Sequence, residues 1–414
     1  MTGLAPHLPE SLLPEALEVA RGIGDEYSRA RALTGLAPHL PEILPEALEV
    51  ARGIGNGEYR AWALTRLAPH LPESLLPEAL EVARGIGNGE YRAEALTGLA
   101  PHLPESLLPE ALEVARGIGN EYYRAEALTG LAPYLPEVLP EALEVARGIG
   151  SEYYRAEALI GLAPHLPEVL PEALELARGI GDERYRAEAL FRLAPYLPES
   201  LLPEALEIAR GIGSEYHRAR ALTGLAPHLP EVLPEALEVA RGIGSEYHRA
   251  EALTGLAPYL PEILPEALAV AKEIGDESDR ARALTGLAPH LPESLLTEAL
   301  EVARGIGSEY HRAEALTGLA PYLPEILPEA LEVARGIGSE YHRADVLKAL
   351  TATLTPANVD LSFWQDVLQA LGSLTRPKFL ETIPNLVPLI LHFGGEVALR
   401  EVYQGIREVS RWWR

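Results

Sequence analysis

A unit of 31 or 32 residues is repeated along most of this 414-residue chain. The triplet Leu-Ala-Pro marks the repeat, with its proline at Pro6, Pro38, Pro69, Pro101, Pro133, Pro164, Pro195, Pro227, Pro258, Pro289 and Pro321. The 32-residue units read Pro-Glu-Ser-Leu-Leu-Pro or Pro-Glu-Ser-Leu-Leu-Thr where the 31-residue units read Pro-Glu-Ile-Leu-Pro or Pro-Glu-Val-Leu-Pro. One residue at one place therefore accounts for all the variation in length. A period of this size predicts a solenoid of stacked units.

The first half of a unit predicts one helix, which is illustrated by residues 246–260. Ser245 is a small polar residue suited to cap the helix, and Glu246 places negative charge in its first turn. An apolar stripe at helical spacing follows: Ala250, Leu253, Leu256, Ala257 and Leu260. Pro258 lacks the N–H that a helix interior requires, so we expect a kink or an early stop there.

The second half of the unit predicts another helix, which has Pro265 in its first turn, where a proline is favourable. Its apolar face consists of Leu264, Leu268, Ala271 and Ile274. We expect Gly275 to end this helix in the left-handed conformation. The fold class predicted is all-α: a right-handed αα-solenoid of about eleven repeats with a helical C-terminal cap. No unit can bury its stripes alone, so each depends on its neighbours.

The two ends of the array differ. The first unit, from Met1, lacks most of its first helix, so we expect a preceding segment or another chain to cover its open apolar seam. We assign 1–344 to the repeats and 345–414 to a degenerate repeat plus a cap that is rich in aromatic residues. Within the cap we predict helices at 361–371, at 377–392 with breaks at Pro384 and Pro388, and at 396–412. The alternative for its last residues is a docking site that uses Trp412 and Trp413.

The repeat resembles known helical repeat families. Its length and two-helix pattern resemble TPR repeats, and the proline inside the first helix resembles HEAT repeats. The strings Ala-Leu-Thr-Gly-Leu-Ala-Pro-His-Leu-Pro-Glu and Leu-Pro-Glu-Ala-Leu-Glu-Val-Ala-Arg-Gly-Ile-Gly, with the closing Arg-Glu-Val-Ser-Arg-Trp-Trp-Arg, look like the C-terminal repeat arrays of bacterial STAND signalling NTPases of the NACHT or NB-ARC type. This resemblance implies a sensor or ligand-recognition array that belongs to a larger signalling protein.

The chain is strongly acidic, and this limits its partners. It has 61 acidic and 35 basic residues, a formal net charge of −26. Residues 1–345 carry a net charge of −27 and residues 346–414 a net charge of +1. Nucleic acid and anionic membranes are therefore poor partners, and a protein with a basic patch is favoured. The absence of cysteine, of a signal peptide and of an 18-residue apolar run leads us to expect a soluble cytoplasmic protein.

The sequence shows no catalytic, metal-binding or cofactor-binding motif, so we expect no enzyme activity and no cofactor. The three lysines never follow a glycine, which excludes a phosphate-binding loop, and Gly-Ile-Gly follows a helix rather than a strand. Histidines recur in two columns, but one column exchanges freely with tyrosine, as in His228 and Tyr322. We interpret these histidines as surface rings rather than ligands.

Deviations from the repeat indicate where a partner binds. Trp62 and Arg66 occupy the columns of Glu251 and Gly255, four residues apart on one helix face. The residues that we consider for partner binding are Trp62, Arg66, Phe191, Arg192, His248, Glu251, Trp412 and Trp413. Two functions stay open: a non-catalytic protein-interaction or sensor solenoid, and a structural repeat protein that associates with itself through open repeat ends.

Overall fold

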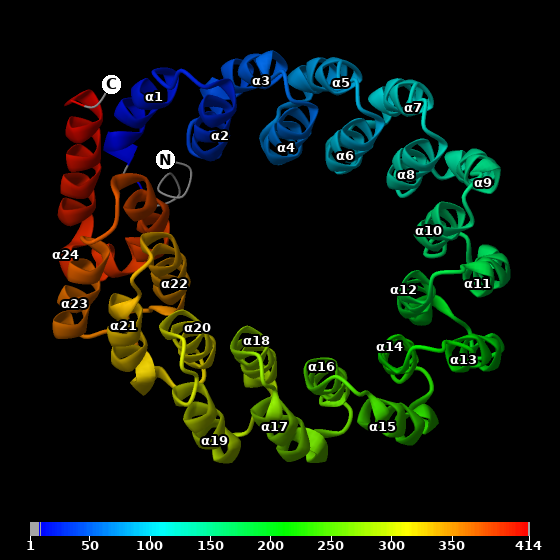
Figure 1. The fold of residues 1–414 in the computed structure, drawn as a ribbon. Coiled ribbons are helices and arrows are strands. Elements are labelled where there is room, and N and C mark those ends of the chain that lie inside the picture. Colours follow the sequence, from blue (N-terminus) through cyan, green and yellow to red (C-terminus); the bar gives the residue numbers. More distant parts are fainter. Residues whose placement is uncertain (1–7, 9, 413–414) are drawn as a thin grey trace. The chain divides into compact units, whose positions relative to one another are not determined.

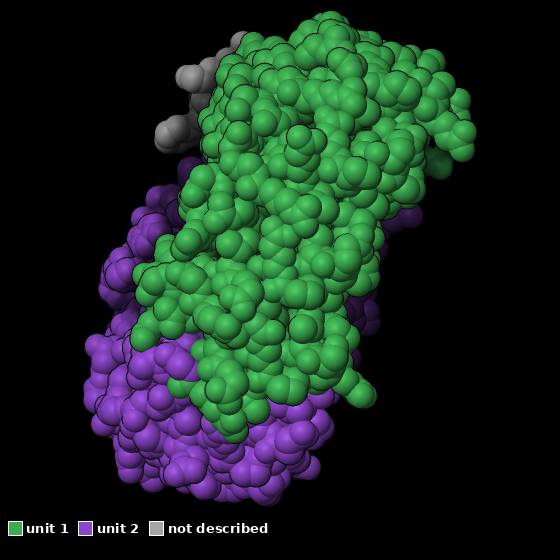
Figure 2. Space-filling model, turned by 90° about the vertical axis from the view of Figure 1, so that its right-hand side faces the viewer, with its two compact units in different colours: residues 1–210 green, residues 211–414 purple. Residues whose placement is uncertain are grey.

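The computed structural model describes residue 8 and residues 10–412, with side chains up to residue 406. The described residues form a succession of α-helices joined by short turns (Figure 1). The chain divides into two compact units, Met1–Arg210 and Gly211–Arg414 (Figure 2), and each is described here by itself. The chain is thus an all-α solenoid, as the repeat predicts. The division by repeat type into 1–344 and 345–414 stays a prediction.

The first helix of each repeat carries an even number in Figure 1, and these helices form one layer of each unit. In the first unit they are α2 (Glu26–Leu36), α4 (Gly57–Leu67), α6 (Gly89–Leu99), α8 (Glu121–Leu131), α10 (Glu152–Leu162) and α12 (Glu183–Leu193). In the second unit they are α14 (Glu215–Leu225), α16 (Glu246–Leu256), α18 (Glu277–Leu287), α20 (Glu309–Leu319) and α22 (Glu340–Thr353).

The second helix of each repeat carries an odd number and belongs to the other layer. In the first unit these helices are α1 (Leu13–Arg21), α3 (Leu44–Gly53), α5 (Leu76–Arg84), α7 (Leu108–Arg116), α9 (Leu139–Gly148), α11 (Leu170–Gly179) and α13 (Leu202–Arg210). In the second unit they are α15 (Leu233–Gly242), α17 (Leu264–Glu273), α19 (Glu293–Arg304) and α21 (Leu327–Gly336). In each unit the even-numbered layer lies on the inside of that unit's own curve (Figure 1).

The predicted helix starts and apolar stripes are confirmed. The Ser245 side chain accepts a hydrogen bond from the backbone N–H of His248 at the start of α16, which satisfies one of the free donors of the first turn. Leu253 and Leu256 are fully buried, and so is Ala271 on the facing helix α17. The stripes of the two layers therefore form one continuous apolar core within each unit.

One predicted helix end is confirmed and another is wrong. Helix α16 stops at Leu256, short of Leu260, which is the early stop expected from Pro258, since this proline cannot continue the hydrogen-bond ladder. Gly275 is not left-handed: among the described residues only Gly395 has a positive φ, of 62°. Helix α17 instead ends when Ile274 turns to an extended conformation, with φ −57° and ψ 120°. A side chain at Gly275 would meet no neighbour within 4 Å, so nothing in the structure explains this glycine.

An arginine in the first helix of each repeat, from α2 to α22, caps the end of the odd-numbered helix before it. Nη1 of Arg155 donates to the carbonyl oxygen of Ile149 at 3.0 Å, and Nη1 of Arg124 donates to that of Ile118 at 2.9 Å. The same bond recurs from Arg29, Arg60, Arg92, Arg186, Arg218, Arg249, Arg280, Arg312 and Arg343. The carbonyl that follows the helix is thus satisfied by a side chain and not by a left-handed glycine.

A second set of arginines links successive odd-numbered helices. Nη2 of Arg147 at the end of α9 lies 2.7 Å from Oε2 of Glu172 at the start of α11. Equivalent pairs are Arg21–Glu46, Arg52–Glu78, Arg84–Glu110, Arg116–Glu141, Arg178–Glu204, Arg241–Glu266 and Arg304–Glu329. The arginines of these pairs are about half exposed, so each pair contributes little stability.

The extra residue of the 32-residue units changes how closely neighbouring even-numbered helices approach. Where the marker prolines are 32 residues apart, a Cβ built on Gly98 would lie 2.5 Å from Oγ1 of Thr65. Gly130 and Gly318 are equally tight against a threonine of the preceding helix. Where the interval is 31, the Cβ of Gly161 would lie 4.0 Å from Thr129, which is ordinary contact. The glycine column is therefore required for packing only after a 32-residue interval.

The C-terminal region is a helical cap, with helices α23 (Leu361–Leu371) and α24 (Arg376–Trp412). Trp364 is 7% exposed and stacks against Phe393, with ring centroids 6.1 Å apart. The predicted breaks at Pro384 and Pro388 are wrong, because the helix runs through both prolines. The predicted division into helices at 377–392 and 396–412 is confirmed, because a kink at the non-helical Gly395 divides α24 into two helices. The stretch Arg376–Ile406 is long and apolar enough to cross a membrane, but helices that pack inside proteins pass the same test.

We predict that Gly98→Ala destabilises the protein by about 1–3 kcal/mol, because the new methyl group would overlap Thr65. The matched control is Gly161→Ala, which we expect to be neutral or to stabilise by about 0.5–1 kcal/mol, since its site is open and alanine favours the helix. Urea unfolding of both variants checks this. Equal effects of the two substitutions would contradict the spacing difference.

We also predict that Arg155→Met costs about 1–3 kcal/mol of unfolding free energy, because the carbonyl of Ile149 loses its donor. Arg147→Met removes an exposed ion pair on the neighbouring helix and should cost less than about 1 kcal/mol. Hydrogen exchange of the Ile149 region measures the local effect. If Arg147→Met were the more damaging change, the capping role would be refuted.

Candidate functional site

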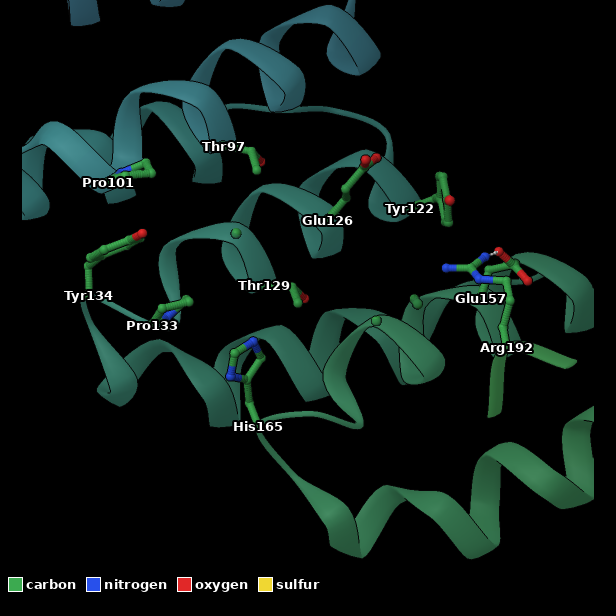
Figure 3. A pocket seen from close by; sticks show the side chains of 13 residues that line it. Thr97, Pro101, Tyr122, Glu126, Thr129, Pro133, Tyr134, Glu157, His165 and Arg192 are labelled. Carbon is green, nitrogen blue, oxygen red and sulfur yellow. Dashed lines mark hydrogen bonds and ion pairs between the residues drawn. The ribbon is translucent and has the colours of Figure 1, made fainter. Parts of the chain in front are cut away.

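The first unit contains an open groove of about 450 Å³ on its even-numbered layer. Helices α6, α8, α10 and α12 supply its walls (Figure 3). The side chains that matter for its chemistry are Tyr122, Glu126, Tyr134, Glu157, His165 and Arg192. Its volume falls in the range of about 300–1,000 Å³ that is usual for ligand sites.

The groove lies where the helix spacing widens. Helices α6 and α8 are tightly packed, since a Cβ on Gly130 would lie 2.5 Å from Oγ1 of Thr97. Helices α8 and α10 are further apart at the same level, where a Cβ built on Gly161 would lie 4.0 Å from Cγ2 of Thr129. On α12 the column glycine is replaced by Arg192, whose side chain reaches back over α10 (Figure 3). The wider spacing thus provides both the groove and the room for this arginine.

Glu157 is the buried charge of the groove. Its side chain is 7% exposed, and Oε2 forms an ion pair with Nη1 of Arg192. The other oxygen, Oε1, is buried and has no hydrogen-bond partner within the described part of the chain. Removing a carboxylate oxygen from water without a donor is costly, so this oxygen lowers the stability of the fold.

Carboxylates that form no ion pair within the described part of the chain lie at the groove and beside it, on the exposed face of α4, α6 and α8. We call Glu58, Glu90, Glu94 and Glu126 the acidic strip. Desolvation, followed by repulsion from Glu90 and Glu94, raises the pKa of Glu126. Desolvation and the charges of Glu58 and Glu90 raise the pKa of Glu94 in the same way. The strip therefore holds negative charge at a cost in folding free energy.

Tyrosine and histidine rings form an aromatic ladder along the start of the even-numbered helices. The Tyr122 and Tyr154 centroids are 5.1 Å apart, and those of Tyr27 and Tyr59 are 3.9 Å apart. In the second unit Tyr216 packs on His248 with centroids 4.5 Å apart. Desolvation raises the pKa of Tyr122, which is therefore a neutral hydroxyl at the groove wall. Packing on the preceding repeat fits the expectation that these histidines are surface rings.

Within the first unit the predicted partner-binding residues lie on two separate helices, α4 and α12. Trp62 is half-buried, with its ring 6.0 Å from that of Tyr27, and the Arg66 guanidinium lies 5.9 Å from its centroid. Phe191 is 44% exposed on α12. In the second unit His248 and Glu251 are exposed on α16. The side chain of Trp412 and the whole of Trp413 lie outside the described residues.

Only Arg192 among these residues lines the groove, and sequence analysis missed its partner Glu157. Glu157 has the same neighbours, Arg-Ala-Glu-Ala-Leu, as Glu126 and Glu251. Two departures from the repeat could have pointed to Glu157. Ile160 replaces the usual threonine in the same helix, and Arg192 replaces the usual glycine in the next repeat. Among the described residues no group of three or more His, Asp or Glu side chains is placed to hold a metal ion.

We predict that Glu126→Gln stabilises the protein at neutral pH by less than about 1 kcal/mol, because the carboxylate stays partly solvated. A raised pKa in the folded state means that the ionised form opposes folding. The cost is present above the folded pKa and disappears as pH falls below the ordinary value of about 4.3. Thermal unfolding of the variant and the parent at neutral pH and at a pH below that ordinary value checks this. A variant that is less stable than the parent at neutral pH would contradict it.

No family model matches the chain, and no curated protein is similar to it at a significant level. Solved structures with similar helical arrays include yeast importin-β, Kap95p, which is 10% identical with a TM-score of 0.42 over 90% of this chain. Kap121p bound to Pho4p is 14% identical, with a TM-score of 0.41 over 93% of this chain. The match spans 61% of the Kap95p chain and 52% of the Kap121p chain.

A third similar structure is a circular tandem repeat protein with a novel repeat topology. It is 21% identical, with a TM-score of 0.18, and the match covers 97% of this chain and 89% of that one. Similarities this distant concern the fold alone. The helix pairs described above show by themselves that the chain is a tandem α-solenoid repeat array.

Proposed function

We propose that this chain is a non-catalytic protein-binding solenoid whose even-numbered layer recognises a basic surface of a partner protein. The observation that carries the proposal is the acidic strip, in which the pKa values of Glu94 and Glu126 are raised by desolvation and by neighbouring carboxylates. A chain that keeps repelling charges together on an exposed face gains stability when a cationic partner binds.

The distribution of arginines supports the same conclusion. One arginine in the first helix of each repeat caps a backbone carbonyl, as Arg124 and Arg155 do. Those of the odd-numbered helices pair with glutamates of the next repeat, as Arg116 does with Glu141. These arginines are thus used at the repeat joints, and within the described part of the chain none of them forms an ion pair with the acidic strip. Charge of one sign on a surface speeds association and selects partners of opposite charge.

We further propose that the array is the ligand-recognition part of a larger bacterial signalling protein of the STAND type and that it works in the cytoplasm. This part of the proposal rests on the repeat strings and the closing Arg-Trp-Trp-Arg described above. A structural array that associates with itself is the alternative. Mass measured against concentration separates the two, because self-association requires a mass that grows with concentration.

The proposal predicts that capture of a partner from lysate of the source organism is lost when salt is raised from roughly 50 mM to roughly 500 mM. Captured proteins are identified by mass spectrometry, and the specific ones should carry basic surfaces. The double variant Glu94→Gln, Glu126→Gln should weaken capture, because it removes two charges of the acidic strip.

Trp62→Ala and Arg66→Ala test whether these two residues contact the partner, as their departure from the repeat predicts. Both residues lie on α4, beside the acidic strip. If they belong to the interface, each substitution weakens capture while salt dependence is kept. Capture that resists high salt, or that survives loss of the strip, would refute the proposed function.

A further inference from the structure

The floor of the groove is one face of helix α8 and of the turn that follows it. The floor residues succeed one another at helical spacing: Tyr122, Glu126, Thr129, Gly130 and Pro133. The middle of the groove is hollow because Gly130 on the floor and Gly161 on the wall have no side chain. At a rise of 1.5 Å per residue, Glu126 and Pro133 lie about 10 Å apart along the groove.

One end of the groove is negatively charged. Figure 3 shows Tyr122, Glu157 and Arg192 at this end, close to Glu126. The charges of Glu157 and Arg192 balance each other in their ion pair. Glu126 is exposed and forms no ion pair within the described part of the chain, so its carboxylate gives this end its charge. A cation is the group that this end favours.

The other end of the groove is made of rings. Pro101, Pro133, Tyr134 and His165 line it, and all four are exposed (Figure 3). The ring of Tyr134 is 40% exposed, which is unusual for so large an apolar surface. Exposed tyrosine and proline rings favour contact with another apolar ring. A ligand that fits the whole groove therefore carries a cation and an apolar ring about 10 Å apart.

A peptide in the polyproline II conformation has this spacing. It has three residues per turn and a rise of 3.1 Å, so side chains three residues apart project from the same side about 9 Å apart. Aromatic-lined grooves bind such segments because their conformation is already formed. A bound β-strand would need a free sheet edge, and the described residues contain helices and no strand.

We propose that this groove binds a polyproline II segment of the partner protein, with a basic side chain opposite Glu126 and a proline three residues away against Pro133 and Tyr134. The inference rests on the proposed function and names the segment by which the partner is recognised. The acidic strip runs from Glu94 on α6 to Glu126, so the charge that selects a basic partner leads into the groove.

The experiment uses the full chain and the peptide acetyl-Pro-Pro-Pro-Lys-Pro-Pro-Pro-amide, with binding followed by NMR at low salt. This peptide has a proline three residues from the lysine in both directions. We expect saturable binding with a dissociation constant on the order of 1 mM. Replacing the lysine by glutamine, or both terminal prolines by glycine, should each weaken binding about threefold. Equal binding of the three peptides would overturn the proposal.

Variants locate the site. Glu126→Gln should weaken binding of the lysine peptide about threefold and leave that of the glutamine peptide unchanged, whereas Tyr134→Ser should weaken both. The matched controls are Glu144→Gln, at an exposed glutamate of α9, and Tyr196→Ser. Tyr196 occupies the column of Tyr134, is 42% exposed and does not line the groove.

Circular dichroism establishes that each variant is folded. Controls that weaken binding as much as Glu126→Gln and Tyr134→Ser would refute the site. If Tyr134→Ser failed to fold, Glu126→Gln against Glu144→Gln would decide with the same two peptides.

The result is distinguishable from a failure of the proposed function. If partner capture weakens with salt and with loss of the acidic strip, but the lysine peptide does not bind, the groove is not the site and the protein-binding role stands. If the peptide binds and Tyr134→Ser weakens it, but no capture depends on the strip, the proposed function fails and the groove still binds polyproline II segments.

Discussion

The array depends on the hydrogen bond from an arginine in the first helix of each repeat to the isoleucine carbonyl six residues before it. This bond closes the end of one helix and fixes the start of the next, as Arg124 does for Ile118. A helix end leaves carbonyls without partners, and here a side chain supplies the donor. Every repeat buries its apolar stripes against its neighbours, so loss of this hydrogen bond would also weaken the packing of the adjacent repeats.

This use of arginines also determines which acidic side chains keep a charge without an ion pair. Arginines in fixed structural positions cannot neutralise the exposed face, and in the first unit that face keeps glutamates such as Glu94 and Glu126 close to one another. Their raised pKa values report a cost in stability at neutral pH. Sites that bind partners commonly give up stability in this way, since optimising the free surface would remove the charge that the partner recognises.

Helix spacing decides which repeat can become a site. After a 32-residue interval the glycine of the even-numbered helix touches a threonine of its neighbour, as Gly98 touches Thr65, and a larger residue has no room. Both arginines of this column, Arg66 and Arg192, follow a 31-residue interval, where the space is open. A single inserted residue therefore controls where the repeat can vary, and the groove lies where two open intervals follow each other.

The sequence alone determined the repeat period, the two helices of each unit, their caps and stripes, and the aromatic cap, because these follow from local patterns and spacing. It misjudged Gly275, Pro384 and Pro388, where a local rule was overridden by packing or by a side chain elsewhere. Only the tertiary structure separated Glu157 from Glu251, which share the same local sequence. Their burial depends on a residue one repeat further along the chain, and for Glu157 that residue is Arg192, 35 positions away.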